Sequence, residues 1–244
     1  MSYTNIAKMI SILKNKFSLL FIYLFVIVSI LEIVAEFFND TQLIWIFKPL
    51  LMPLLIAYYI KKSKKINFIF VVSLIFSWIA NLIFISKETD DIILGSFFFL
   101  IYRTLIIFLV FRLVKLPTRI PLIIGSIPFL FVYATVCFLT FEEMGNSIVI
   151  FIVHCIFIVF LGGYSLGSFI INYSKSSLFL FISTMLFAIS QFVFVLKVYS
   201  NYDYLLHSVA MLMFVVAQYC LTKFILIKDN PRVKYEFVSN INEL

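Results

Sequence analysis

FKPLLMP (residues 47–53) and, after one basic turn, FSWIAN (residues 76–81) place a lysine, two prolines and an asparagine within strongly apolar sequence. Both stretches lie in runs that are long and apolar enough to cross a bilayer. Ionisable and helix-breaking residues at membrane depth are energetically costly, so each of them is a candidate for a functional site. If they form one site, other polar groups must lie at the same depth in neighbouring helices.

The composition is that of an integral membrane protein. Of the 244 residues, 64% are hydrophobic and 13% are charged, whereas a soluble domain is roughly half apolar and about a quarter charged. The net charge of +7 does not indicate nucleic-acid binding, because the basic residues are held in a few loops, where they orient the protein and contact anionic head groups. We therefore expect a membrane lipid as the partner, and no nucleic acid.

The cysteines predict neither a metal site nor a cofactor. Cys137, Cys155 and Cys220 are far apart in apolar segments, without CxxC or Cys/His spacing, so we interpret them as small buried residues. The first apolar run is longer than a signal-peptide core and lacks a small-residue cleavage site, so we interpret it as a membrane span.

Eight apolar segments predict an all-α, polytopic membrane helix bundle. A span needs about 20 mainly apolar residues, and short loops favour antiparallel neighbours. The predicted spans are Phe17–Phe38, Leu43–Ile60, Ile66–Ser86, Ile92–Phe111, Ile120–Phe141, Ser147–Ile171, Leu178–Tyr199 and Tyr204–Ile227. They form a single transmembrane domain (17–227) between a cytoplasmic N-terminal segment (1–16) and a polar cytoplasmic tail (228–244).

The basic residues predict that both termini lie in the cytoplasm. Fifteen Lys and Arg residues fall in the termini and even-numbered loops, against two in the odd-numbered loops, Lys87 and Lys197. Cytoplasmic loops carry the excess of Lys and Arg, and an even number of spans is needed to bring both termini to one side. We expect a multi-pass protein of a bacterial cytoplasmic membrane.

Two segments of similar sequence favour an internal repeat. NLIFISK (81–87) in the third predicted helix is similar to QFVFVLK (191–197) in the seventh, and both helices run in the same direction. This pattern is compatible with a parallel four-plus-four repeat. Chance similarity between two helices rich in Phe, Ile and Val is the alternative.

Polar side chains gather mainly in the predicted outer half of the bilayer. Glu32 and Glu36 are four residues apart and so share a helix face. Other helices contribute Lys48, Asn81, Arg103, His154, Gln191 and His207, with Gln218 lying deeper. This clustering predicts a pocket within the membrane that is displaced toward the outer side.

Each polar residue also has a structural interpretation. Glu36 could lie at the water interface, and Lys48 could extend outward to the head groups. Arg103 is too deep to do so, and we expect a buried acidic partner for it. Glu32 and Glu36 against Lys48 and Arg103 would then form a neutral, buried ion-pair network that holds the bundle together. The histidines and amides are also typical hydrogen-bonding partners between helices.

The two prolines predict a kink in the second helix, near Trp45–Pro53. Proline removes a backbone N–H and frees the carbonyl four residues earlier. Freed carbonyls at membrane depth are tolerated where they line a buried or water-filled cavity. A kink that serves helix packing alone is the alternative.

Five motifs occur in order along the chain: Lys48-Pro49-Leu50-Leu51-Met52-Pro53, Ser77 with Asn81, Gly95-Ser96-Phe97-Phe98-Phe99, Phe187-Ala188-Ile189-Ser190-Gln191 and Ala217-Gln218-Tyr219. They resemble the YhhN family of eight-span membrane proteins, which includes the animal lysoplasmalogenases, and the resemblance covers about Leu43 to Leu226. It implies hydrolysis of the vinyl ether bond of a lysoplasmalogen, which yields a fatty aldehyde and a glycerophospho-base.

Three of these motifs depart from the family pattern, at four positions. The family has Ser-x-x-Gly-Asp where this chain has Ala80-Asn81, and Ser-Asp where it has Ser190-Gln191. Arg103 stands where a His usually follows the Gly-x3-Phe segment by four residues. This chain therefore lacks both aspartates of the family pattern, and amides cannot exchange protons in their place.

The implied reaction needs a general acid, a base and a cation for the phosphate. Two carboxylates in a low-dielectric site can divide the proton-transfer roles. Glu32 and Glu36 are the carboxylates left at that depth, so we expect them to act as acid and base, with Asn81 and Gln191 orienting a water or the ether oxygen. The predicted substrate-binding residues are Lys48, Ser77, Arg103, His154, Ser190, His207 and Gln218.

Two other functions are compatible with the sequence. The first is a catalytically inactive protein of the same fold that binds a lysolipid. The second is a small transporter, although a transport path needs polar groups on both sides of the bilayer midplane.

Overall fold

Eight α-helices account for nearly all of the residues that the computed structural model describes, which are 3–86, 88–199 and 205–230. They are α1 (Tyr3–Phe37), α2 (Thr41–Lys62), α3 (Phe68–Ile83), α4 (Thr89–Leu113), α5 (Arg119–Met144), α6 (Ile148–Ile171), α7 (Lys175–Tyr199) and α8 (Leu205–Asp229), with a 3-10 turn at Gly145–Ser147. No strand occurs in this part of the chain, which confirms the all-α prediction. Seven helices are long and apolar enough to cross a membrane, and the shorter α3 has 16 residues.

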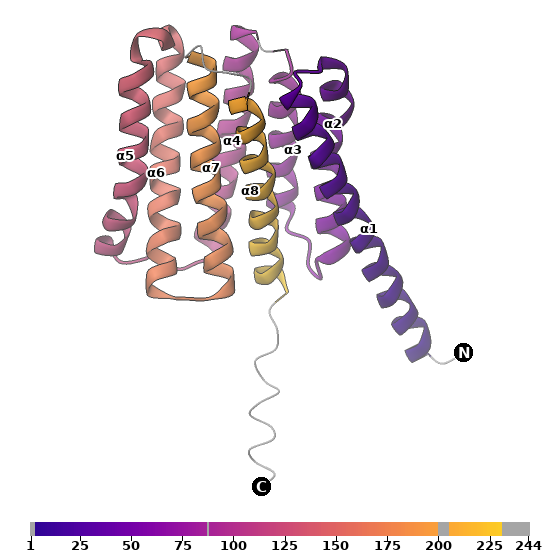
Figure 1. Ribbon diagram of the computed structural model, residues 1–244. Coiled ribbons are helices and arrows are strands. Elements are labelled where there is room, and N and C mark those ends of the chain that lie inside the picture. The colour runs from indigo at the N-terminus through magenta and orange to yellow at the C-terminus, as the bar shows by residue number, and fades with distance from the viewer. Residues whose placement is uncertain (1–2, 87, 200–204, 231–244) are drawn as a thin grey trace.

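The helices form antiparallel hairpins, which pair α1 with α2, α3 with α4, α5 with α6 and α7 with α8 (Figure 1). The last helix is central, because α8 packs against α7, α1 and α2 and is the most buried of the seven long helices. An even number of passes brings the start of α1 and the end of α8 to the same end of the bundle (Figure 1).

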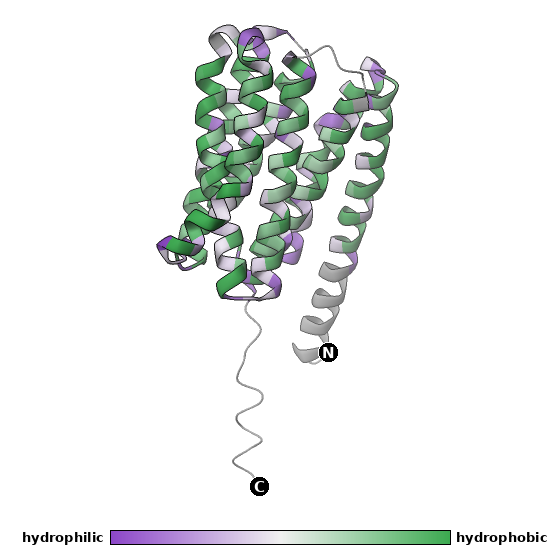
Figure 2. Cartoon of the chain, turned by 60° about the vertical axis from the view of Figure 1, so that its left-hand side comes forward, coloured by the Kyte–Doolittle hydropathy of each residue, from purple (hydrophilic) through white to green (hydrophobic). Residues whose placement is uncertain are grey.

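The surface of the bundle is apolar along most of its length (Figure 2). Large side chains such as Phe138 (85% exposed) and Phe131 (72% exposed) project outward from α5. These exposures suit a helix that faces lipid, since a soluble protein rarely leaves so much contiguous apolar surface open to water.

The predicted division into an N-terminal cytoplasmic segment, a transmembrane domain and a tail stays a prediction. Residues 3–16 are helical and continue the helix of the first predicted span, because α1 begins at Tyr3. Of the predicted tail, residues 231–244 lie outside the described part of the chain, as do Lys87 of the predicted repeat and Tyr204 at the start of the last predicted span. The four-plus-four repeat stays a prediction.

The prolines of α2 have a packing role. Pro53 lacks the N–H that would bond to the carbonyl of Pro49, one turn earlier. In the structure the indole Nε1–H of Trp78, on α3, donates to that carbonyl oxygen at 2.8 Å. The carbonyl freed by Pro53 therefore takes part in the contact between α2 and α3. Pro49 does not line the cavity that is described below.

This contact gives a testable prediction. Trp78→Phe should destabilise the protein by about 1–3 kcal/mol, because the freed carbonyl loses its donor. In a Pro53→Ala background the same change should cost much less, because the introduced alanine supplies a backbone N–H to the Pro49 carbonyl. The measurement is the free energy of unfolding in detergent, followed by circular dichroism.

Trp45→Phe is the matched control, because Trp45 is 57% exposed and should tolerate the change. An equal cost of Trp78→Phe in both backgrounds would show that the hydrogen bond to Pro49 does not stabilise the bundle.

Candidate functional site

Four ionisable residues from α1, α2 and α8 meet inside the bundle and are called the acid cluster here: Glu32, Glu36, Lys48 and His207. Nζ of Lys48 lies 2.6 Å from Oε1 of Glu36 and 3.9 Å from Oε1 of Glu32. Nε2 of His207 lies 3.0 Å from the same Glu36 oxygen. All four residues are buried, so Glu36 does not lie at the water interface and Lys48 does not extend outward.

The sequence brings this cluster together through a tight hairpin. Glu32 and Glu36 lie one turn apart near the end of α1, and Asn39 adopts a positive φ of 52° in the turn that follows. Asp40 then caps α2, with its Oδ1 accepting from the backbone N–H groups of Gln42 and Leu43. The short connection places Lys48 opposite the glutamates.

The charges of Glu32, Glu36 and Lys48 do not sum to zero when both carboxyl groups are ionised. Two carboxylates face one ammonium, so the set becomes neutral only when it holds one further proton, on a carboxyl group or on His207. Both side-chain oxygens of Glu32 and Oε2 of Glu36 are buried without a hydrogen-bond partner among the described residues. Since buried polar atoms are nearly always paired, these unpaired oxygens leave the cluster able to take up a proton in addition to joining α1, α2 and α8.

Arg103 lies elsewhere, in contact with α6 and α7. Its Nη1 donates to Oε1 of Gln191 at 2.7 Å and to the carbonyl oxygen of His154 at 3.5 Å, and its guanidinium lies 5.2 Å from the centre of the Phe99 ring. No carboxylate in the described ranges forms an ion pair with it. The expectation of a buried acidic partner, and with it the neutral four-residue network, is wrong, because the glutamates of α1 face α2 and α8 instead.

The predicted amide and hydroxyl residues of α3, α7 and α8 form hydrogen bonds between helices or within one helix. Nε2 of Gln218 donates to Oγ of Ser77 at 3.0 Å, while its Oε1 accepts from the hydroxyl of Tyr102 at 3.2 Å. Asn81 donates to the Ser77 carbonyl in its own helix at 2.7 Å. Ser190 donates to the carbonyl of Ala210, on α8, at 2.7 Å.

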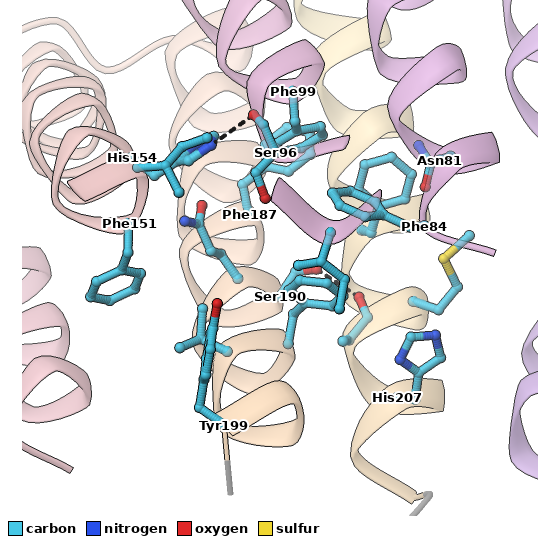
Figure 3. Close-up of a pocket in the computed structure, with 18 of the residues that line it drawn as sticks. Asn81, Phe84, Ser96, Phe99, Phe151, His154, Phe187, Ser190, Tyr199 and His207 are labelled. Carbon is cyan, nitrogen blue, oxygen red and sulfur yellow. Dashed lines mark hydrogen bonds between the residues drawn. The ribbon is translucent and has the colours of Figure 1, made fainter. Parts of the chain in front are cut away.

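A cavity of about 940 Å³, open mouth included, lies between the acid cluster and α6. Figure 3 shows Asn81 and His207 on one side of it and His154 on the other. Lys48, Ser190 and Gln191 also line it, whereas Glu32, Glu36, Arg103, Ser77 and Gln218 do not. Most of its wall is aromatic or aliphatic, and its lining residues come from the half of the bundle away from the chain ends, as the predicted pocket requires.

The sequence reasoning missed several lining residues. The aromatic wall is built from Phe84, Phe99, Phe151, Phe187, Phe194 and Phe214. Ser96 also lines the cavity, and its carbonyl oxygen accepts from Nε2 of His154 at 3.0 Å. Phe99 and Phe187 lie in the motifs quoted above, but a chain with 31 Phe residues offers no signal that separates cavity walls from lipid-facing surface.

No group of three or more His, Cys, Asp or Glu side chains suited to a metal ion occurs in the described ranges. Cys220 is buried, whereas Cys137 and Cys155 are only partly so, and all three are free thiols.

Comparison with known proteins supports the resemblance. The model of the YhhN family matches residues 43–225, nearly the range that the motifs indicate. No curated protein and no solved structure matches the chain. The matched range begins after α1, so Glu32 and Glu36 lie outside it, while Lys48 and His207 lie within it.

The ion pair of the acid cluster can be tested by its effect on stability. Lys48→Met should destabilise the protein by about 3–5 kcal/mol, because it leaves the Glu36 carboxylate buried without its counter-charge. Adding Glu36→Gln to that variant should recover part of the loss. The measurement is the free energy of unfolding in detergent.

Lys61→Met, at an exposed position in the last turn of α2, is the control and should change stability little. If the losses of unfolding free energy in Lys48→Met and Glu36→Gln simply add in the double variant, the two side chains do not stabilise each other.

Proposed function

Because this chain belongs to the YhhN family, which includes the lysoplasmalogenases, we propose that it binds a single-chain ether phospholipid within the membrane and hydrolyses its vinyl ether bond. The observation that carries this proposal is the cavity, which combines an aromatic wall with the imidazole of His207 backed by Glu36.

The charge distribution supports one placement in the membrane. Basic residues close α2, α4 and α8 at the end that also holds the start of α1: Lys61, Lys62, Arg112 and Lys228. By the positive-inside rule, this end faces the cytoplasm of a bacterial cell. The cavity then lies in the outer half of the bilayer, where single-chain lipids of the outer leaflet can enter it.

Hydrolysis of a vinyl ether needs a group that donates a proton to the substrate and later takes one up again. An acid protonates the vinyl carbon that is not bonded to oxygen, and the resulting oxocarbenium ion takes up water at its other carbon. Loss of a proton gives a hemiacetal, and cleavage of its C–O bond releases a fatty aldehyde and the alcohol of the glycerophospho-base. A single group that gives up and then regains a proton can serve the first two steps.

We assign that role to His207. It lines the cavity, whereas Glu36 lies behind it with Oε1 at 3.0 Å from Nε2. Glu36 then acts as a positioning residue that orients the imidazole and stabilises its charged form, as carboxylates commonly do for histidine. Glu32 and Lys48 set the charge of the cluster. The glutamates thus act through His207 rather than directly on the substrate.

A binding protein without catalysis is the second candidate, and a specific observation favours it. Asn81 and Gln191 stand where the family pattern has aspartates, and both amides are engaged in hydrogen bonds, to the Ser77 carbonyl and to Arg103. A transporter is less compatible with the structure, since the cavity is lined from one half of the bundle.

The proposal predicts that the purified protein releases fatty aldehyde from a 1-alkenyl lysophospholipid. His207→Gln and Glu36→Gln should each lower the rate by about 100-fold or more, the usual contribution of general acid–base catalysis. The measurement is aldehyde release in detergent or proteoliposomes, coupled to an alcohol dehydrogenase that consumes NADH.

Glu142→Gln, exposed at the end of α5, is the matched control and should keep full activity. Unfolding midpoints of the variants separate lost catalysis from lost folding. Unchanged turnover in His207→Gln would rule out the assigned role. If the wild-type protein releases no aldehyde but retains lysolipid in native mass spectrometry, the binding function replaces the hydrolase.

A further inference from the structure

Arg103 is a buried cation without a counter-charge among the described residues. It is 3% exposed, and its polar contacts are with the neutral oxygens of Gln191 and of the His154 backbone. A guanidinium has five N–H donors and stays charged in proteins. Burying such a charge without an anion is costly, so an anion supplied by a ligand would lower the free energy of this region.

Lys48, a cation that lines the cavity, already has a counter-charge. Lys48 lies 2.6 Å from Glu36, and the acid cluster already contains more carboxylates than ammonium groups. A phosphate next to Lys48 would therefore meet two glutamates behind it. Between these two cations, Arg103 is the one that attracts an anion.

Arg103 lies next to the cavity without lining it. Side chains on a helix tilt toward its N-terminus, and the N-terminal half of α4 supplies Ser96 and Phe99 to the cavity wall. Arg103 lies one turn beyond Phe99, with its guanidinium against that ring and bonded to Gln191, another lining residue. Arg103 itself lines a smaller hollow of about 350 Å³, and Phe187 lines both spaces.

We propose that Gln191, which lines the cavity, and Arg103, which donates to it, form the subsite for the anionic group of the ligand. The ligand is a single-chain amphiphile with a phosphate head group, because the planar guanidinium donates two parallel N–H groups to phosphate oxygens. This inference rests on the proposed lipid-binding function and adds the residue that selects the head group. It also explains the neutral partner, since an acid at position 191 would bind Arg103 and leave no charge for the ligand.

The test compares single-chain lipids of one chain length by calorimetric titration of the purified protein in detergent. Lysophosphatidate should bind about tenfold or more tightly than the uncharged monoacylglycerol, the ratio expected for charge-assisted hydrogen bonds. Arg103→Gln should remove this preference and leave monoacylglycerol binding nearly unchanged. Gln191→Glu should remove it too, because the new carboxylate pairs with Arg103 inside the protein.

Arg112→Gln, an exposed site on the same helix, is the matched control and should keep the preference. The subsite is wrong if Arg103→Gln still prefers lysophosphatidate, or if the wild-type protein binds both lipids equally. Inorganic phosphate alone should bind at least about tenfold more weakly than the lipid phosphate, because it lacks the contacts of the chain with the apolar wall. Equal affinity would overturn the assignment to a lipid head group.

The hydrolase and the subsite fail in different ways. Charge-selective lipid binding without aldehyde release supports the subsite and removes the hydrolase. Aldehyde release with equal KM from alkenyl-glycerophosphate and from phosphate-free alkenyl-glycerol supports the hydrolase and overturns the subsite.

Discussion

A charge buried among membrane helices must find an opposite charge nearby, and the contact between Glu36 and Lys48 meets that requirement. It joins α1 to α2 inside the bundle, and His207 connects α8 to the same carboxylate. The first helix is thereby attached to the central one, although α1 lies outside the residues matched by the family model. Because neither carboxylate can leave its position without exposing a charge to hydrocarbon, the wall of the cavity formed by Lys48 and His207 is held in place.

The sequence was sufficient to place residues along each helix, but it did not show on which face of the helix each polar side chain lies. The lengths of the apolar segments were sufficient to predict eight helices, and the spacing of Glu32 and Glu36 predicted a shared face, which the structure places next to Lys48. The error concerned Arg103. Depth follows from counting residues along a helix, but the face on which a side chain lies depends on which side of the helix is packed. A helix that is apolar all round gives no such signal, so the contact of Arg103 with Gln191 could not be predicted.

The departures from the family pattern become clearer once their contacts are known. Two of the departing residues, Gln191 and Arg103, are hydrogen-bonded to each other. Gln191, which stands where the family pattern has an aspartate, is therefore a neutral partner of the Arg103 guanidinium. Asn81 bonds within its own helix. The carboxylates that remain come from α1 and lie behind His207.

The acid cluster and Arg103 lie on different sides of the cavity and differ in the charge that each leaves unpaired, and under the proposed function this constrains how a ligand can bind. The acid cluster has one carboxylate more than its ammonium can balance, whereas Arg103 has no acid within salt-bridge distance among the described residues. In the proposed binding mode, an anionic head group is repelled by the carboxylates of the acid cluster and attracted to Arg103. This would orient an amphiphile across the cavity. With its head group at Arg103, the part of the ligand that lies against the opposite wall faces His207. The electrostatics that we propose to select the ligand would therefore also bring its vinyl ether bond to His207, the residue that we propose to exchange the proton.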